Sequence, residues 1–111
     1  MVEDVPGRGD FVWLQFPPQA GHEQAGRRPA LVVSTREFNA VTPFIWVVPI
    51  TSQEKGYPFE VKIPPGLPVS GVVLVDQLKS MDRLERQARV MGQAPPDFLE
   101  DVLAKIEAIL R

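Results

Sequence analysis

The chain has 111 residues, with 12 basic and 14 acidic side chains, a single His and no Cys. This length predicts one domain spanning residues 1–111. Without Cys there are no disulfides or thiolate metal sites, and one His excludes the usual zinc ligand sets, so we expect neither metal nor cofactor. The first ten residues carry no apolar segment, and we therefore expect no signal peptide, no membrane contact and a cytoplasmic location.

Short apolar runs make up the first 90 residues or so, separated by most of the chain's 12 prolines and 8 glycines. They are rich in β-branched and aromatic residues, which is typical of strands in a small antiparallel barrel or sandwich. The expected strands are Asp10–Phe16, Ala30–Ser34, Phe44–Ile50, Pro58–Ile63 and Gly71–Lys79, with a weaker one at Arg89–Met91.

The pattern within these runs predicts which faces are covered. In Pro58–Ile63, Phe59, Val61 and Ile63 alternate with charged residues and are expected to point inward. The runs Ala30–Ser34 and Val72–Val75 lack such alternation, so both of their faces should be covered.

The C-terminal segment changes period. Apolar residues recur there at intervals of three and four, from Phe98 to Leu110, which predicts an amphipathic helix of about four turns. Pro95 and Pro96 suit its first turn, and Asp97 places a negative charge at the positive end of the helix dipole. We expect this helix to pack on the sheet or to cap an interface.

Two polar segments interrupt the apolar runs. The first, "GHEQAGRRPALVVS" (Gly21–Ser34), puts Glu23, Arg27 and Arg28 on a loop and at a strand entrance. The second, "PITSQEKGYPFEV" (Pro49–Val61), ends a strand with hydroxyls, an amide and a cation, and "VDQLKS" (Val75–Ser80) ends another. Such groups suit phosphates and base edges. Taken singly, each is equally explained as solvated loop or turn chemistry.

The order and spacing of these segments, and of "GDFVWLQF" and "GVVLVDQLKSMD", are those of the MazF/PemK toxins. The chain resembles this family over its whole length. The resemblance is closest to the MazF branch. The resemblance implies a mainly β fold, an SH3-like antiparallel barrel of five to seven strands with a C-terminal helix. It also implies a homodimer, and a sequence-specific, metal-independent endoribonuclease that cuts single-stranded mRNA. A MazE-like antitoxin with an acidic, largely disordered tail would hold the toxin inactive.

The same resemblance implies the site residues. Arg28 matches the family's catalytic arginine, Thr51 its strand-end threonine, and Glu23 the acidic residue of its Ser-Glu-Gln loop. The general base stays open between Glu23 and His22, which replaces the usual Ser. The residues expected to contact RNA are Phe16, His22, Gln24, Arg27, Ser52, Gln53, Lys55, Gln77 and Lys79.

Two other functions fit the same fold class. One is a gyrase-poisoning toxin of the CcdB type, and the other is a non-catalytic SH3-like binding module. The large side chains Trp13, Phe16 and Trp46 exceed what one thin core needs, so some of them should be buried between two subunits. The RNA sequence that is cut and the identity of the antitoxin are not encoded in these motifs.

Overall fold

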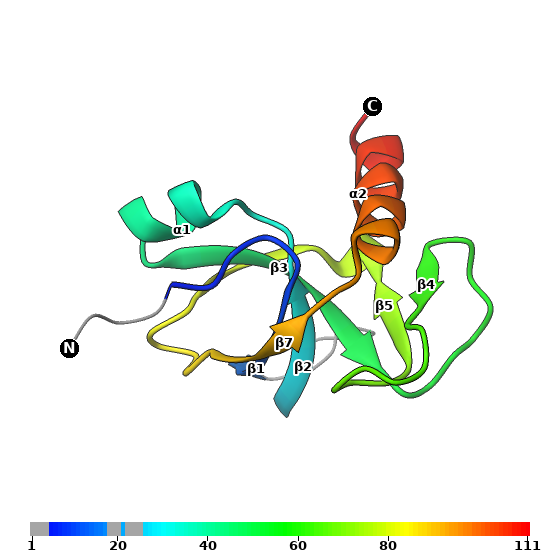
Figure 1. Cartoon of the computed structure of the whole chain (residues 1–111), viewed down its shortest axis with the longest axis horizontal. Coiled ribbons are helices and arrows are strands. Elements are labelled where there is room, and N and C mark those ends of the chain that lie inside the picture. The colour runs from blue at the N-terminus through cyan, green and yellow to red at the C-terminus, as the bar shows by residue number, and fades with distance from the viewer. Residues whose placement is uncertain (1–4, 18–20, 22–25) are drawn as a thin grey trace.

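The computed structural model describes residues 5–17, 21 and 26–111, and within them seven strands form one antiparallel sheet. Figure 1 shows its elements in chain order. They are β1 (Asp10–Phe16), β2 (Gly26–Val32), α1 (Arg36–Val41), β3 (Phe44–Thr51), β4 (Glu60–Lys62), β5 (Val72–Leu74), the 3-10 turn η1 (Val75–Gln77), β6 (Lys79–Asp82), β7 (Arg89–Gln93) and α2 (Pro96–Leu110).

Strand β3 pairs with three other strands, β2, β5 and β6. The strand order is β4-β5-β3-β2-β1-β7, and β6 pairs with the first half of β3. The end of β3, at Ile50 and Thr51, pairs with β5. The sheet is open, with β4 and β7 at its two ends. The predicted mainly β fold with a C-terminal helix is confirmed.

Apolar side chains cover both faces of the central strands. One cluster contains Phe11, Leu31 and Val48 together with residues of β4, β5 and α2, and the other contains Val12, Val32 and Val47 with Met81 of β6. Successive residues of β1, β2 and β3 therefore enter opposite clusters, as the pleat of a strand requires. The prediction of coverage on both faces is confirmed for Val72–Val75 and, within Ala30–Ser34, for residues 30–33, whereas Ser34 is only half-buried.

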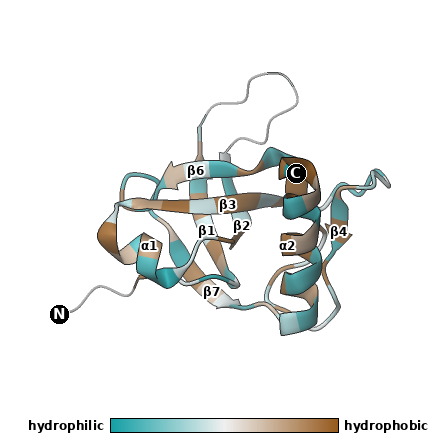
Figure 2. Ribbon diagram, turned by 90° about the horizontal axis from the view of Figure 1, so that it is seen from above, coloured by the Kyte–Doolittle hydropathy of each residue, from teal (hydrophilic) through white to brown (hydrophobic). Residues whose placement is uncertain are grey.

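Helix α2 closes the first cluster. Its Phe98 and Val102 are buried, and the Phe98 ring lies 6.3 Å from that of Phe11, centroid to centroid. In both views α2 lies beside β4 and the end of β3, whereas α1 lies at the opposite end of the molecule (Figures 1 and 2). Neither helix in the described part of the chain is long and apolar enough to span a bilayer.

Helix α1 was not expected from the apolar pattern, because it has only six residues. Its N-cap is Thr35, whose side chain accepts a hydrogen bond from the Phe38 amide at 3.2 Å. Asn39 of this helix is fully buried and donates to the Pro6 carbonyl oxygen at 2.8 Å, which fixes the segment before β1.

The bounds of several strands differ from the predicted ones. Strand β2 begins four residues earlier than expected, at Gly26, so Arg27 and Arg28 lie within a strand. Phe59 precedes β4 and is 37% exposed, whereas Val61 and Ile63 are buried as predicted. The run Gly71–Lys79 is not one strand, because η1 turns the chain from β5 to β6 and leaves Asp76 at the surface.

Candidate active site

The start of β2 and the end of β3 lie side by side. Their antiparallel register pairs Ala30 with Pro49, so two residues further toward these ends Arg28 comes opposite Thr51. Both line one hollow, and Trp13, Arg27 and Ser52 line it too. The structure thus brings together the cation and the hydroxyl that the sequence places 23 positions apart. We call this hollow the Arg28–Thr51 pocket.

Thr51 is held in a defined orientation. It is only 8% exposed, and its Oγ1 accepts a hydrogen bond from the Gln53 amide at 3.2 Å. Because the hydroxyl oxygen is engaged as an acceptor, its hydrogen is left to be donated to another group. Thr51 is therefore suited to donate a hydrogen bond to an anion in the pocket.

Gly71 shapes the backbone beside Thr51. Its φ of +113° is a conformation that other L residues rarely adopt, and a Cβ at this position would collide with the Thr51 carbonyl oxygen. Only glycine allows β5 to begin so close to the end of β3.

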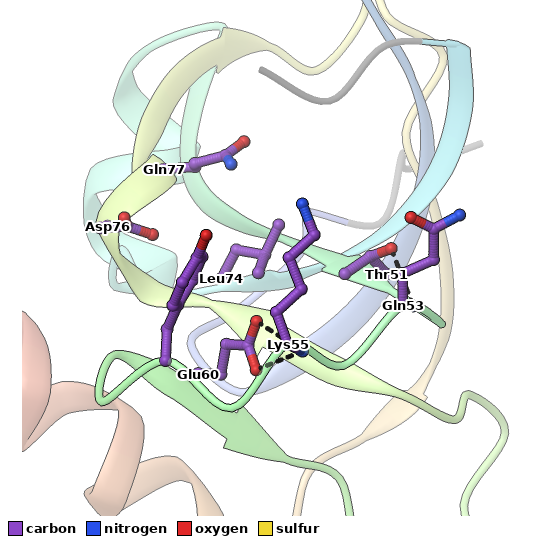
Figure 3. Close-up of a pocket in the computed structure, with 8 residues that line it drawn as sticks. Thr51, Gln53, Lys55, Glu60, Leu74, Asp76 and Gln77 are labelled. Carbon is purple, nitrogen blue, oxygen red and sulfur yellow. Dashed lines mark hydrogen bonds between the residues drawn. The ribbon is translucent and has the colours of Figure 1, made fainter. Parts of the chain in front are cut away.

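Thr51 also lines a second hollow, of about 290 Å³, which we call the Gln53–Gln77 pocket. Figure 3 shows the Lys55 side chain ending between Gln77 and Thr51, with Gln53 on the far side of Thr51. Amides and an ammonium group around one opening can donate to phosphate oxygens and pair with base edges.

The Glu60 carboxylate shapes the loop that carries Gln53 and Lys55. Its Oε1 accepts from the Gly56 amide at 2.9 Å, and both of its oxygens accept from the Lys55 amide, at 3.1 and 3.2 Å. Gly56 has a φ of +79°, so the loop makes a tight turn around this carboxylate (Figure 3). Glu60 thus fixes the backbone from which the Lys55 side chain projects.

The predicted site residues separate into groups. Arg27, Arg28, Thr51 and Ser52 line the Arg28–Thr51 pocket, and Gln53, Lys55 and Gln77 line the Gln53–Gln77 pocket. Lys79 lines a different hollow, beside Phe44 and Arg86. The residues His22, Glu23 and Gln24 lie outside the described ones.

Phe16 does not line either pocket. Its side chain is 1% exposed and packs in the second core cluster, among Leu14, Ala30 and Ile45. The alternation of β1 explains this placement, because Phe16 shares its face with Val12 and Leu14. The structure therefore gives Phe16 a core role, in place of the predicted RNA contact.

Several lining residues were missed by the sequence reasoning. They are Trp13 and Ser70 in the Arg28–Thr51 pocket, and Tyr57, Glu60, Leu74 and Asp76 in the Gln53–Gln77 pocket. Tyr57 and Glu60 were within the quoted motif, and Trp13 within the first predicted strand. Their types alone did not mark them, because a strand tryptophan is as easily explained by packing.

The chemistry of the two pockets rests on cations, hydroxyls and amides. Within residues 5–17, 21 and 26–111, no group of three His, Cys, Asp or Glu side chains could hold a metal ion. A guanidinium and a hydroxyl directed at one point can stabilise a pentavalent phosphorus centre by hydrogen bonds.

The chain is similar to known proteins in both sequence and structure. Residues 7–110 match the family model described as PemK-like, MazF-like toxin of type II toxin–antitoxin systems. The endoribonuclease toxin MazF of Escherichia coli K12 is 43% identical over 106 residues, covering 96% of this chain and 95% of the relative.

Solved structures give the same result. The crystal structure of MazF from Deinococcus radiodurans is 51% identical, with a TM-score of 0.92 over 97% of this chain and 98% of that one. A MazE–MazF crystal structure from the same organism matches with a TM-score of 0.87 and 51% identity, over 97% of each chain.

Proposed function

This chain belongs to the PemK-like, MazF-like toxin family of type II toxin–antitoxin systems and is an endoribonuclease toxin; we propose that it cuts single-stranded mRNA at a specific short sequence without a metal ion. The observation that carries the proposal is the shared pocket of Arg28 and Thr51. Both supply hydrogen-bond donors for a phosphate, and neither requires a cofactor.

The proposed reaction uses the RNA's own nucleophile. The 2′-OH attacks the adjacent phosphorus, an O–P bond forms at the 2′ oxygen, and the bond from phosphorus to the 5′ oxygen breaks. A base takes the proton of the 2′-OH, and an acid protonates the leaving 5′ oxygen. The products are a 2′,3′-cyclic phosphate and a free 5′-OH.

Arg28 and Thr51 have distinct parts in this reaction. The guanidinium presents a planar, positively charged fork of N–H donors, so Arg28 stabilises the charge on the phosphorane and is a candidate to donate a proton to the leaving oxygen. Thr51 donates its hydroxyl hydrogen to the phosphate, an orientation supported by the Gln53 amide. The base stays open among Glu23 and His22, on the segment that precedes β2, and another group.

We also propose two protein partners. One is a cognate MazE-like antitoxin, as the MazE–MazF complexes of Deinococcus radiodurans support. The other is a second copy of this chain. Phe38, Val41, Phe44 and Trp46 are exposed around α1 and the start of β3, a concentration of apolar side chains that a subunit contact would cover.

Cleavage of a long single-stranded RNA in the presence of EDTA tests the nuclease proposal. We expect discrete fragments that end in 2′,3′-cyclic phosphate and begin with 5′-OH. Arg28→Ala should lower the cleavage rate about 100- to 1,000-fold with the fold intact, because a preorganised donor to a developing charge is lost. Arg111→Ala, at the end of α2, removes the same charge away from the pocket and should cleave normally.

Two results would contradict the assignment. Nearly wild-type activity in Arg28→Ala would show that Arg28 is not the catalytic group. Intact RNA after incubation with the wild-type protein would refute the nuclease itself; inhibition of gyrase in the same preparation would then indicate a CcdB-type toxin.

A further inference from the structure

Three side chains on neighbouring strands form a hollow next to the Arg28–Thr51 pocket. Trp13 of β1 lies opposite Arg89 of β7 and opposite Pro29 of β2. Arg27 is two residues from Pro29, so it lies on the same face of β2 as Trp13 does on β1. Together with Gln87, these three side chains line a hollow of about 530 Å³.

The indole of Trp13 is exposed where its neighbours are covered. Phe11 shares its strand face but is fully buried beneath Phe98 of α2. Trp13, by contrast, belongs to neither core cluster and is 37% exposed. A large aromatic ring left open beside a polar pocket is a surface on which another planar group can stack.

Arg27 is fixed in place but not fully satisfied. Its Nη2 donates to the Gln87 carbonyl oxygen at 3.2 Å, whereas its Nη1 is buried without a hydrogen-bond partner among the described residues. Gln87 has a φ of 55° in the turn between β6 and β7. The Asp82 carboxylate holds the start of that turn by accepting from the amides of Leu84 and Glu85 at 3.0 and 2.9 Å.

The charge of this hollow is positive. In the described part of the chain, no carboxylate lies within ion-pair distance of Arg27 or Arg89. A shielded N–H without an acceptor is costly, and an anionic oxygen would satisfy it. Two guanidinium groups beside an exposed indole match the two parts of a nucleotide, its phosphate and its base.

We propose that Trp13, Arg27 and Arg89 form a nucleotide subsite, in which a base flanking the cleavage site stacks on Trp13 and its phosphate binds Arg27 and Arg89. This inference rests on the proposed RNA cleavage. Trp13 and Arg27 line both this hollow and the Arg28–Thr51 pocket, so an RNA strand leaving the scissile phosphate can enter the subsite directly. That continuity favours RNA over a protein segment as the occupant.

The test measures binding separately from cleavage. The cleaved RNA sequence is first mapped with the wild-type protein, then prepared with 2′-O-methyl groups throughout so that it cannot attack its own phosphates. Trp13→Leu should weaken binding of this probe about 5- to 150-fold, the range for one stacked base, and Trp13→Phe should recover part of the loss. Phe59→Leu is the matched control, since Phe59 is as exposed as Trp13 but lines neither pocket nor this hollow.

The arginine contacts are tested by the salt dependence of binding. Arg89→Gln should weaken binding and reduce the slope of log affinity against log salt by about 0.7, as expected for one phosphate contact with a single strand. Arg111→Gln should change neither. Circular dichroism and thermal melting establish that each variant is folded, and Trp13→Phe and Arg89→Gln remove little buried volume.

The outcomes separate this subsite from the nuclease. A wild-type protein that cleaves no RNA refutes the proposed function. If RNA is cleaved but Trp13→Leu and Arg89→Gln bind the probe as tightly as wild type, the subsite is refuted alone. If those variants bind RNA normally and lose affinity for a purified antitoxin, the hollow belongs to the antitoxin and the RNA assignment is overturned.

Discussion

At the scale of single residues, Thr51 shows how a hydroxyl is prepared for a ligand. Its oxygen accepts from the Gln53 amide, and its side chain lines both pockets. A serine could make the same contacts without the methyl group, whereas an alanine could make none of them.

We therefore predict different effects for two substitutions at this position. Thr51→Ala should reduce RNA cleavage by about 100-fold, because one preorganised donor to the phosphate is lost. Thr51→Ser should keep much of the activity. Single-turnover cleavage rates measure both, and equal losses in the two variants would show that the methyl group, not the hydroxyl, is required.

At the scale of elements, the loop between β3 and β4 depends on one carboxylate. Glu60 accepts hydrogen bonds from two consecutive backbone amides, of Lys55 and Gly56. In Glu60→Gln, one oxygen is replaced by an NH₂ group and the charge is lost, so these bonds weaken.

We predict that Glu60→Gln raises the KM for RNA about fivefold, equivalent to a loss on the order of 1 kcal/mol, and leaves kcat nearly unchanged. Hydrogen exchange of the Lys55 and Gly56 amides should become faster. Glu54→Gln is the control, because Glu54 lies on the same loop and its carboxylate pairs with the exposed Lys62 side chain, at 3.8 Å. Unchanged exchange at both amides in Glu60→Gln would refute the positioning role.

Helix α2 is the second element that can be tested. Phe98→Ala should lower the free energy of unfolding by about 3–5 kcal/mol, because the buried ring against Phe11 is removed and leaves a cavity. Chemical denaturation measures this change. Glu100→Ala, on the exposed side of the same helix, should alter stability by less than about 0.5 kcal/mol. A similar small effect for Phe98→Ala would show that α2 does not seal the core.

At the scale of the whole molecule, the exposed apolar residues around α1 predict self-association. Phe44 and Trp46 are 43% and 42% exposed, although large aromatic side chains contribute most when buried. Sedimentation at micromolar concentration should therefore show a dimer. A monomer throughout that range would contradict the proposed assembly. RNA cleavage is measured separately and is not used to judge the oligomeric state.

Features that depend on a local pattern could be predicted from the sequence alone. The apolar period of the C-terminal segment predicts α2, and the β-branched runs predict β1, β2, β3, β4 and β7 to within about four residues. They do not separate β6 from the run that contains β5. Arg28, Thr51, Gln53 and Lys55, which line the pockets, were selected through the resemblance to the MazF/PemK toxins. The residues alone indicated only polar groups clustered at strand ends, which turn chemistry also explains.

Which side chains share a site could be seen only in the tertiary fold. Phe16 and Trp13 lie on the same strand, yet the pleat sends Phe16 into a core cluster and Trp13 to the pocket edge. Arg27 and Arg89 come together because β2 and β7 flank β1, a pairing of distant segments. The sheet register fixes such proximities, and it depends on turn geometry and on which distant strands pair, as well as on the apolar alternation within each segment.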